Sequence, residues 1–174
     1  ALVRQFDSPR GPIVSADGIV VARSVQAPGD SDVKYMRTYP TGDLFAHITG
    51  YYTYGLGSTQ VEKTESAVLS GDTFNQQIGA IDDIFSGAND QSGEVRLTVS
   101  EELQRVAKFL LGDREGSVVL IEVETGAINA MWSYPSFDPN LVAAPDYDAA
   151  YDYVTELQAD ERDPLLANAY QQRY

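Results

Sequence analysis

The fold of this chain is decided by one stretch, Gly116-Ser-Val-Val-Leu-Ile-Glu-Val-Glu-Thr-Gly-Ala-Ile-Asn-Ala-Met-Trp-Ser-Tyr-Pro-Ser-Phe-Asp-Pro-Asn140. It predicts a hairpin of two strands, over residues 117–123 and 127–133, with a tight turn between them. The first strand is too apolar to be solvated on both faces, so we expect it in the centre of a sheet. A hairpin of this kind needs further strands beside it.

The hairpin is preceded by a predicted helix. Ser100 is a favourable N-cap, and Gly112 is placed to end the helix. Apolar residues at helical spacing give this helix one apolar face, made of Leu103, Val106, Ala107, Leu110 and Leu111. After the hairpin, we expect a second helix over residues 148–158 and a third over 165–174.

The first half of the chain is predicted to be rich in strands. Residues 13–22 carry Asp17-Gly18 between two β-branched runs, which predicts a hairpin with a type I′ turn. A strand should cover 35–39, a short helix or strand 44–54, and a helix 61–69. The stretch Ser86–Gly93 contains only small and polar residues, so it is the preferred border between two modules.

Length and composition restrict the function. The chain has 174 residues, 12 basic and 26 acidic side chains, and a net charge of −14. The charge is 6 − 11 = −5 over residues 1–93 and 6 − 15 = −9 over residues 94–174. Such a chain repels nucleic acid, so we expect no nucleic-acid partner. The sequence has no cysteine, which excludes disulfides and thiolate chemistry.

Four motifs in register resemble class B penicillin-binding proteins of the actinobacterial type. They are Arg10-Gly11-Pro12-Ile13 with Asp17-Gly18, Arg37-Thr38-Tyr39-Pro40-Thr41-Gly42, Glu62 with Leu69-Ser70-Gly71, and Val95-Arg96-Leu97-Thr98-Val99-Ser100 with Leu103-Gln104. Ser100 stands where the family usually has aspartate, and both residues cap helices.

The resemblance implies an α+β fold in two parts. Residues 1–90 would form the β-rich pedestal or dimerisation module. Residues 94–174 would form the first helix and hairpin of a transpeptidase domain, which is similar to serine β-lactamases. The parent would be a D,D-transpeptidase that cross-links peptidoglycan stem peptides and binds β-lactams. It would be anchored on the extracytoplasmic face of a bacterial membrane.

The family's nucleophile, a Ser-x-x-Lys serine, is expected just beyond Tyr174, so we expect this chain to be non-catalytic. Its partners would be the remainder of its transpeptidase domain and proteins of cell-wall synthesis or division. It would meet β-lactams and stem peptides only through the catalytic part. We expect no cofactor and no catalytic, cofactor-binding or metal-binding residue here.

Several residues were weighed against this expectation. Ser31-Asp32-Val33-Lys34 has the Ser-x-x-Lys spacing, but no helix is predicted there to align the two side chains. His47, the single histidine, is expected to be structural. Solvated charge is the preferred interpretation of Asp82-Asp83 and of Asp146, Asp148 and Asp152. Two alternative functions remain: a stand-alone cell-surface interaction or carbohydrate-binding domain, and a small acidic hydrolase.

Overall fold

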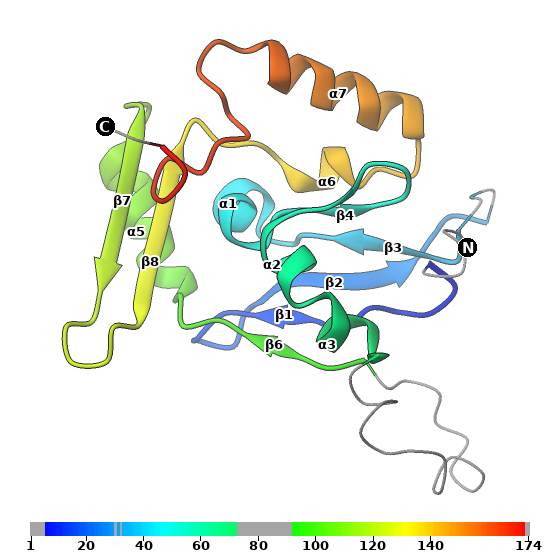
Figure 1. Cartoon of the computed structure of the whole chain (residues 1–174), viewed down its shortest axis with the longest axis horizontal. Coiled ribbons are helices and arrows are strands. Elements are labelled where there is room, and N and C mark those ends of the chain that lie inside the picture. Colours follow the sequence, from blue (N-terminus) through cyan, green and yellow to red (C-terminus); the bar gives the residue numbers. More distant parts are fainter. Residues whose placement is uncertain (1–5, 30, 32, 73–91, 173–174) are drawn as a thin grey trace, which may run out of the picture.

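The computed structural model describes residues 6–29, 31, 33–72 and 92–172. Its largest sheet has the strand order β3-β2-β1-β6 (Figure 1). Strands β1 (Ile13–Val14), β2 (Val20–Gln26) and β3 (Tyr35–Thr38) are antiparallel neighbours. Strand β6 (Val95–Arg96) comes from the second half of the chain and pairs with β1 in parallel. The sheet therefore joins both halves.

The predicted hairpin at residues 13–22 is confirmed, but its predicted turn type is wrong. A type I′ turn needs positive φ at both central residues, and here only Gly18 has one, at 82°. The backbone N–H of Ser15 donates to the carbonyl of Ile19, and that of Gly18 to the carbonyl of Ser15. The carboxylate of Asp17 is held by a distant helix instead, as described below.

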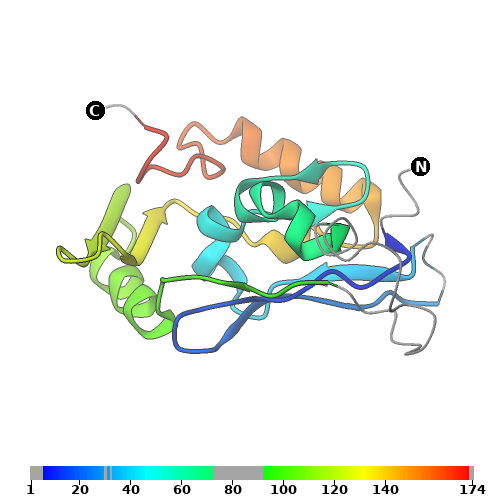
Figure 2. The same ribbon diagram turned by 60° about the horizontal axis from the view of Figure 1, so that its bottom comes forward.

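A layer of short elements covers one face of this sheet (Figure 2). It consists of η2 (Gly42–Phe45), α1 (Ala46–Thr49), the small hairpin β4 (Tyr52–Thr53) and β5 (Gly57–Ser58), α2 (Gln60–Thr64) and α3 (Ser66–Ser70). The helix predicted over 61–69 is confirmed in position but is interrupted, because the backbone leaves helical geometry at Glu65 between α2 and α3. Thr64 and Ser66 flank the break, and such side chains compete with the helical backbone for hydrogen bonds.

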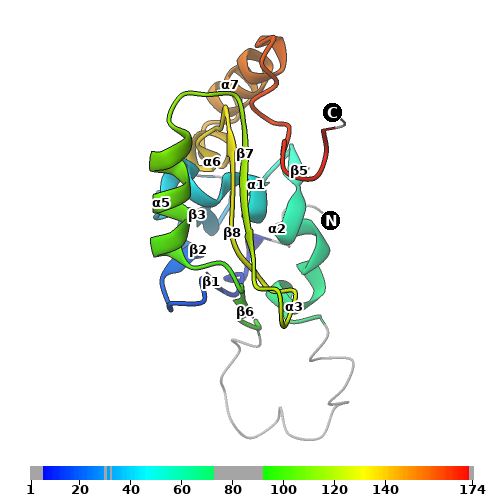
Figure 3. The same cartoon turned by 90° about the vertical axis from the view of Figure 1, so that its left-hand side faces the viewer.

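The helix before the main hairpin has the predicted bounds. Helix α5 (Glu101–Leu111) begins after Ser100, whose side chain accepts from Leu103 N, and ends at Gly112 with φ 59°. It packs along β8 on one side of the hairpin (Figure 3). The residues that α5 buries are Gln104 and Ala107, while Val106 and Leu110 are 48% and 60% exposed. Most of its apolar face is therefore uncovered in this structure.

The main hairpin consists of β7 (Gly116–Ile121) and β8 (Ile128–Tyr134), paired antiparallel with Val118 opposite Trp132. Ala130 and Trp132 point into the core and are buried. Among the described residues β7 pairs with β8 alone, and its residues Val119 to Ile121 are 41–53% exposed. The predicted central position of this strand therefore has no counterpart among the described strands.

One hydrophobic core is built from both halves of the chain. Ile13, Tyr39 and Phe45 meet Val99, Ala107 and Trp132 in a single cluster. A smaller cluster lies under α6 (Pro139–Val142) and α7 (Tyr147–Ala159), and α7 confirms the helix predicted over 148–158. The third predicted helix is wrong over residues 165–172, which form turns. The side chain of Asn168 and the backbone N–H of Ala169 bond to Tyr134 and Ser133 of β8 instead of continuing a helix.

The division into modules at 1–90 and 94–174 stays a prediction. The preferred border, Ser86–Gly93, falls mostly on residues outside those that the structure describes.

Candidate functional site

A buried charge cluster lies at the centre of the first half. Glu62 accepts from Arg10 Nε at 2.7 Å and from Arg37 Nε at 2.6 Å, and the three side chains are at most 5% exposed. Arg37 Nη1 also donates to the carbonyls of Arg10 (3.1 Å) and Gly11 (2.8 Å). Two guanidinium groups share one carboxylate, so the cluster carries a net charge of +1. It ties the segment before β1 to β3 and α2.

We use the name seam for the contact surface between residues 6–72 and residues 92–172. The first seam contact is made by Asp17 at the start of α5. Its carboxylate accepts from the backbone N–H of Glu101 (3.0 Å) and Glu102 (3.2 Å) and from Ser100 Oγ (3.1 Å). Burial alone would raise the pKa of Asp17, but the hydrogen bonds from Glu101, Ser15 and Glu102 hold it well below its usual range.

The second seam contact is the side-chain amide of Gln104, which is 1% exposed. Its Nε2 donates to the carbonyl of Leu44 (3.0 Å) and to that of Met131 (2.7 Å). Its Oε1 accepts from the backbone N–H of Met131 at 2.8 Å. One side chain thus joins η2 in the first half to β8 in the second.

The third seam contact involves the turns near the end of the described chain. The hydroxyl of Tyr170 donates to the carbonyl of His47 at 3.0 Å, and Nε2 of His47 lies 2.9 Å from the carbonyl of Pro164. Asn168 Nδ2 donates to the carbonyl of Tyr134 on β8. Burial lowers the pKa of His47, although the bond to Pro164 opposes this. His47 therefore lies buried in a packing role.

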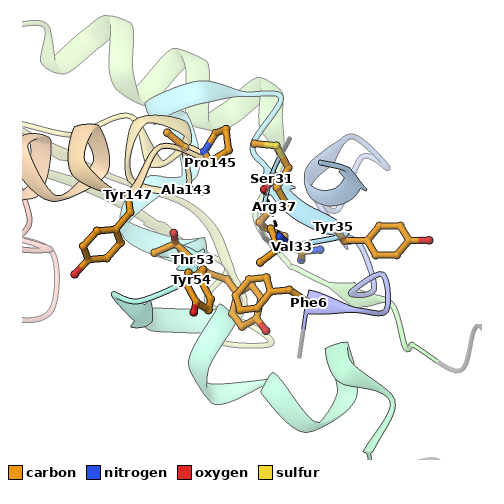
Figure 4. A pocket seen from close by; sticks show the side chains of 13 residues that line it. Phe6, Ser31, Val33, Tyr35, Arg37, Thr53, Tyr54, Ala143, Pro145 and Tyr147 are labelled. Carbon is orange, nitrogen blue, oxygen red and sulfur yellow. Dashed lines mark hydrogen bonds between the residues drawn. The ribbon is translucent and has the colours of Figure 1, made fainter. Parts of the chain in front are cut away.

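A pocket of about 90 Å³ opens on another side of the molecule (Figure 4). It lies between β3 and β4 and the loop that leads from α6 to α7. Its walls are largely aromatic and include Phe6, Tyr35, Tyr52, Tyr54 and Tyr147. Arg37 contributes to its lining, and Arg37 Nη2 has no hydrogen-bond partner among the described residues.

The other residues singled out in the sequence lie apart from one another in the structure. Ser31 and Lys34 lie in bends before β3, not on a helix. Asp146 caps α7 by accepting from the N–H of Asp148 and Ala149. Asp82-Asp83 lies outside the described residues. Within those described, no group of His, Asp and Glu side chains has the arrangement of a metal site.

Sequence reasoning missed the seam residues as a set. Asp17 was assigned to a turn, and Gln104 was noted only as part of a motif. Gln104 lies one turn before Ala107 on the buried side of an amphipathic helix, and this position is a signal of a buried amide. Its partners, Met131 and Leu44, lie 27 and 60 residues away in the sequence.

Residues 10–95 match the family described as "Penicillin binding protein A dimerisation domain". The chain belongs to the penicillin-binding protein family.

Two relatives cover 99% of the chain. It is 36% identical to the peptidoglycan D,D-transpeptidase PbpA of Mycolicibacterium smegmatis and 29% identical to that of Mycobacterium tuberculosis. The chain spans 36% of the length of each of them.

Solved structures share the fold. The imipenem acyl-enzyme complex of penicillin-binding protein A from M. tuberculosis matches 95% of this chain, with a TM-score of 0.84 and 28% identity over 38% of that protein. A D,D-transpeptidase domain from Eggerthella lenta matches with a TM-score of 0.66 and 30% identity, over 92% of this chain and 32% of that one. No helix of the described ranges is both long and apolar enough to span a membrane.

Proposed function

We propose that this chain is the non-catalytic scaffold of a peptidoglycan D,D-transpeptidase. In this proposal residues 1–90 are the dimerisation module, and residues 94–174 begin the transpeptidase domain. The observation that carries the proposal is the seam, where side chains of one half bond to backbone of the other. A flexible spacer would have few buried contacts across such a border, whereas the buried amide of Gln104 bonds across it to the carbonyl of Leu44 and, within its own half, twice to Met131.

The exposed apolar surface supports a role as part of a larger sheet domain. Phe109 is 83% exposed and Leu110 is 60% exposed on α5, and Ile121 is 53% exposed on β7. Monomeric proteins rarely leave large contiguous apolar patches uncovered. We propose that the remainder of the transpeptidase domain covers this surface and pairs with the outer edge of β7.

The chemistry would lie outside these residues. Acyl transfer of this class uses a serine hydroxyl that is activated by a lysine one helical turn later. The single such spacing in this chain, at Ser31 and Lys34, lies in bends. We propose that stem peptides and β-lactams react with the parent's catalytic part. Because peptidoglycan is outside the cytoplasmic membrane, the parent would act on the extracytoplasmic face, anchored by a segment of its own.

The test is a chimera in which this chain replaces the matching third of the M. smegmatis relative. Both the chimera and the isolated chain are treated with fluorescent penicillin and examined by intact mass. The proposal expects a single covalent adduct on the chimera and none on the isolated chain. An adduct on the isolated chain would show that it holds its own nucleophile. A folded chimera that fails to react would show that this chain cannot replace the relative's scaffold.

A further inference from the structure

The aromatic pocket continues onto the outer face of α7. Tyr54 and Tyr147 form its rim and are 39% and 45% exposed, and Pro145 lies opposite Phe6 and Tyr54 (Figure 4). The ring of Tyr147 stacks on that of Tyr151 one turn further along α7, with centroids 6.2 Å apart. Pocket and tyrosine pair together form an aromatic groove.

Helix α7 also carries a row of carboxylates, of which Asp148 lies one turn before Tyr151. Asp148, Asp152 and Glu156 are exposed and follow one another at intervals of four residues on α7. The ion pairs found among the described residues include none of the three. Like charges at this spacing repel one another and destabilise the helix. A cationic partner would relieve that repulsion, and lysine or arginine could also lie over the neighbouring tyrosine rings.

The pocket itself favours a neutral and small group. Its volume of about 90 Å³ is small compared with the ~150 Å³ of a closed cavity that holds benzene, so a compact side chain fits it best. Arg37 belongs to the pocket lining and to a cluster of net charge +1, which disfavours a cation inside. Aromatic-lined grooves are the usual receptors of extended, proline-containing peptides, whose restricted backbone loses little entropy on binding.

We propose that this groove binds an extended basic peptide segment of a partner protein. A proline- or valine-sized residue would occupy the pocket between Pro145 and Tyr54. A neighbouring lysine or arginine would lie over Tyr147 and Tyr151, beside the carboxylates of α7. The proposal deepens the scaffold role proposed above by naming a partner class, and it can fail without affecting that role, because it does not involve the seam.

The test uses the 174-residue chain and a fluorescein-labelled peptide, Ala-Pro-Val-Pro-Lys-Lys, followed by fluorescence anisotropy. We expect saturable binding that weakens as salt is added, and little binding of the matched peptide Ala-Pro-Val-Pro-Glu-Glu. Tyr147→Ala should weaken binding at least about fivefold. The triple change Asp148→Asn, Asp152→Asn and Glu156→Gln should remove most of the salt dependence. Phe109→Ala, an exposed aromatic on α5, is the matched control and should bind as the unmodified chain does.

Three results would overturn the proposal. The first is no saturable binding, and the second is equal affinity for the lysine and glutamate peptides. The third is a loss with Phe109→Ala as large as that with Tyr147→Ala, in proteins with unchanged circular dichroism. Binding of chitotetraose instead of the peptide, abolished by Tyr147→Ala, would reassign the groove to glycan.

Discussion

The side-chain amide of Asn140 bonds twice to the backbone of Tyr39. Oδ1 accepts from Tyr39 N at 2.8 Å, and Nδ2 donates to Tyr39 O at 2.9 Å. A neighbouring strand would exchange the same pair of bonds with this residue. Asn140 therefore pairs with the residue that directly follows β3 from 101 residues away, and it belongs to the seam. The exit of the main hairpin is fixed to the dimerisation domain at this point.

Changing Asn140 to Asp should destabilise the chain by about 1 to 3 kcal/mol. The carboxylate can still accept from Tyr39 N, but it faces the Tyr39 carbonyl without a proton to donate. Urea unfolding at neutral pH measures the loss. Gln158→Ala, at an exposed position on α7, is the control and should change stability little. If the Asn140→Asp protein is as stable as the control, the two hydrogen bonds between Asn140 and Tyr39 contribute nothing to stability.

The cap of α5 by Asp17 should give a pH-dependent contribution. Because the pKa of Asp17 is lowered in the folded protein, its contribution is present above the unfolded pKa of about 3.9 and is lost as pH falls below it. Asp17→Ala should cost about 1 kcal/mol at pH 7. The free energy of unfolding of the unmodified and the Asp17→Ala protein is measured as the pH is lowered. The difference between the two free energies should become smaller. A gap that stays constant to the acid limit would contradict the role of the charge.

Removing the carboxylate of the buried cluster should be far more damaging. Glu62→Gln leaves Arg10 and Arg37 without their counter-charge in the interior, at a cost of about 3 to 5 kcal/mol. Glu65→Gln, at the break between α2 and α3 and partly exposed, is the matched control. Thermal and urea unfolding of both variants give the comparison. If the two variants are equally stable, the negative charge of Glu62 is not needed to stabilise Arg10 and Arg37 in the interior.

His47 should make the chain less stable as the solution is acidified. Burial lowers the pKa of His47 in the folded protein, so the unfolded state takes up the proton first. Stability attributable to this residue is then highest above pH ~6.5 and decreases below it. His47→Gln cannot take up that proton. Urea unfolding at pH 7.5 and at pH 5.5 should therefore show a larger acid-induced loss in the unmodified chain, and an equal loss in both would contradict the assignment.

Local features of the structure follow from the sequence, and long-range ones do not. The bounds of α5 were predictable because Ser100 and Gly112 act on their own backbone. The bounds of α7 were likewise predictable within one residue, and the positions of the hairpins at 13–22 and 116–134 were predictable although the turn type of the first was not. The contacts of Asp17 with α5 and of Asn140 with Tyr39 join residues 84 and 101 apart, and no local pattern signals them.

The wrong predictions also come from contacts between residues that are far apart in the sequence. Residues 165–172 have helix-forming composition, but Asn168 and the backbone of Ala169 bond to β8. The apolar face of α5 was found correctly as a pattern, yet the pattern does not say what covers it. Family resemblance brought Arg10, Arg37 and Glu62 to attention through their motifs. Their meeting in one cluster required the tertiary structure.

The scaffold role is tested most directly by the acylation rate of the chimera described above. Gln104→Ala removes the seam bond to Leu44 together with the two bonds to Met131 on β8, and Gln158→Ala, at an exposed position on α7, is the control. Both are compared with the unmodified chimera well below their melting temperatures, using fluorescent penicillin. We predict a reduced acylation rate for Gln104→Ala and an unchanged rate for Gln158→Ala. An unchanged rate for Gln104→Ala in a folded chimera would contradict the claim that the seam positions the catalytic part.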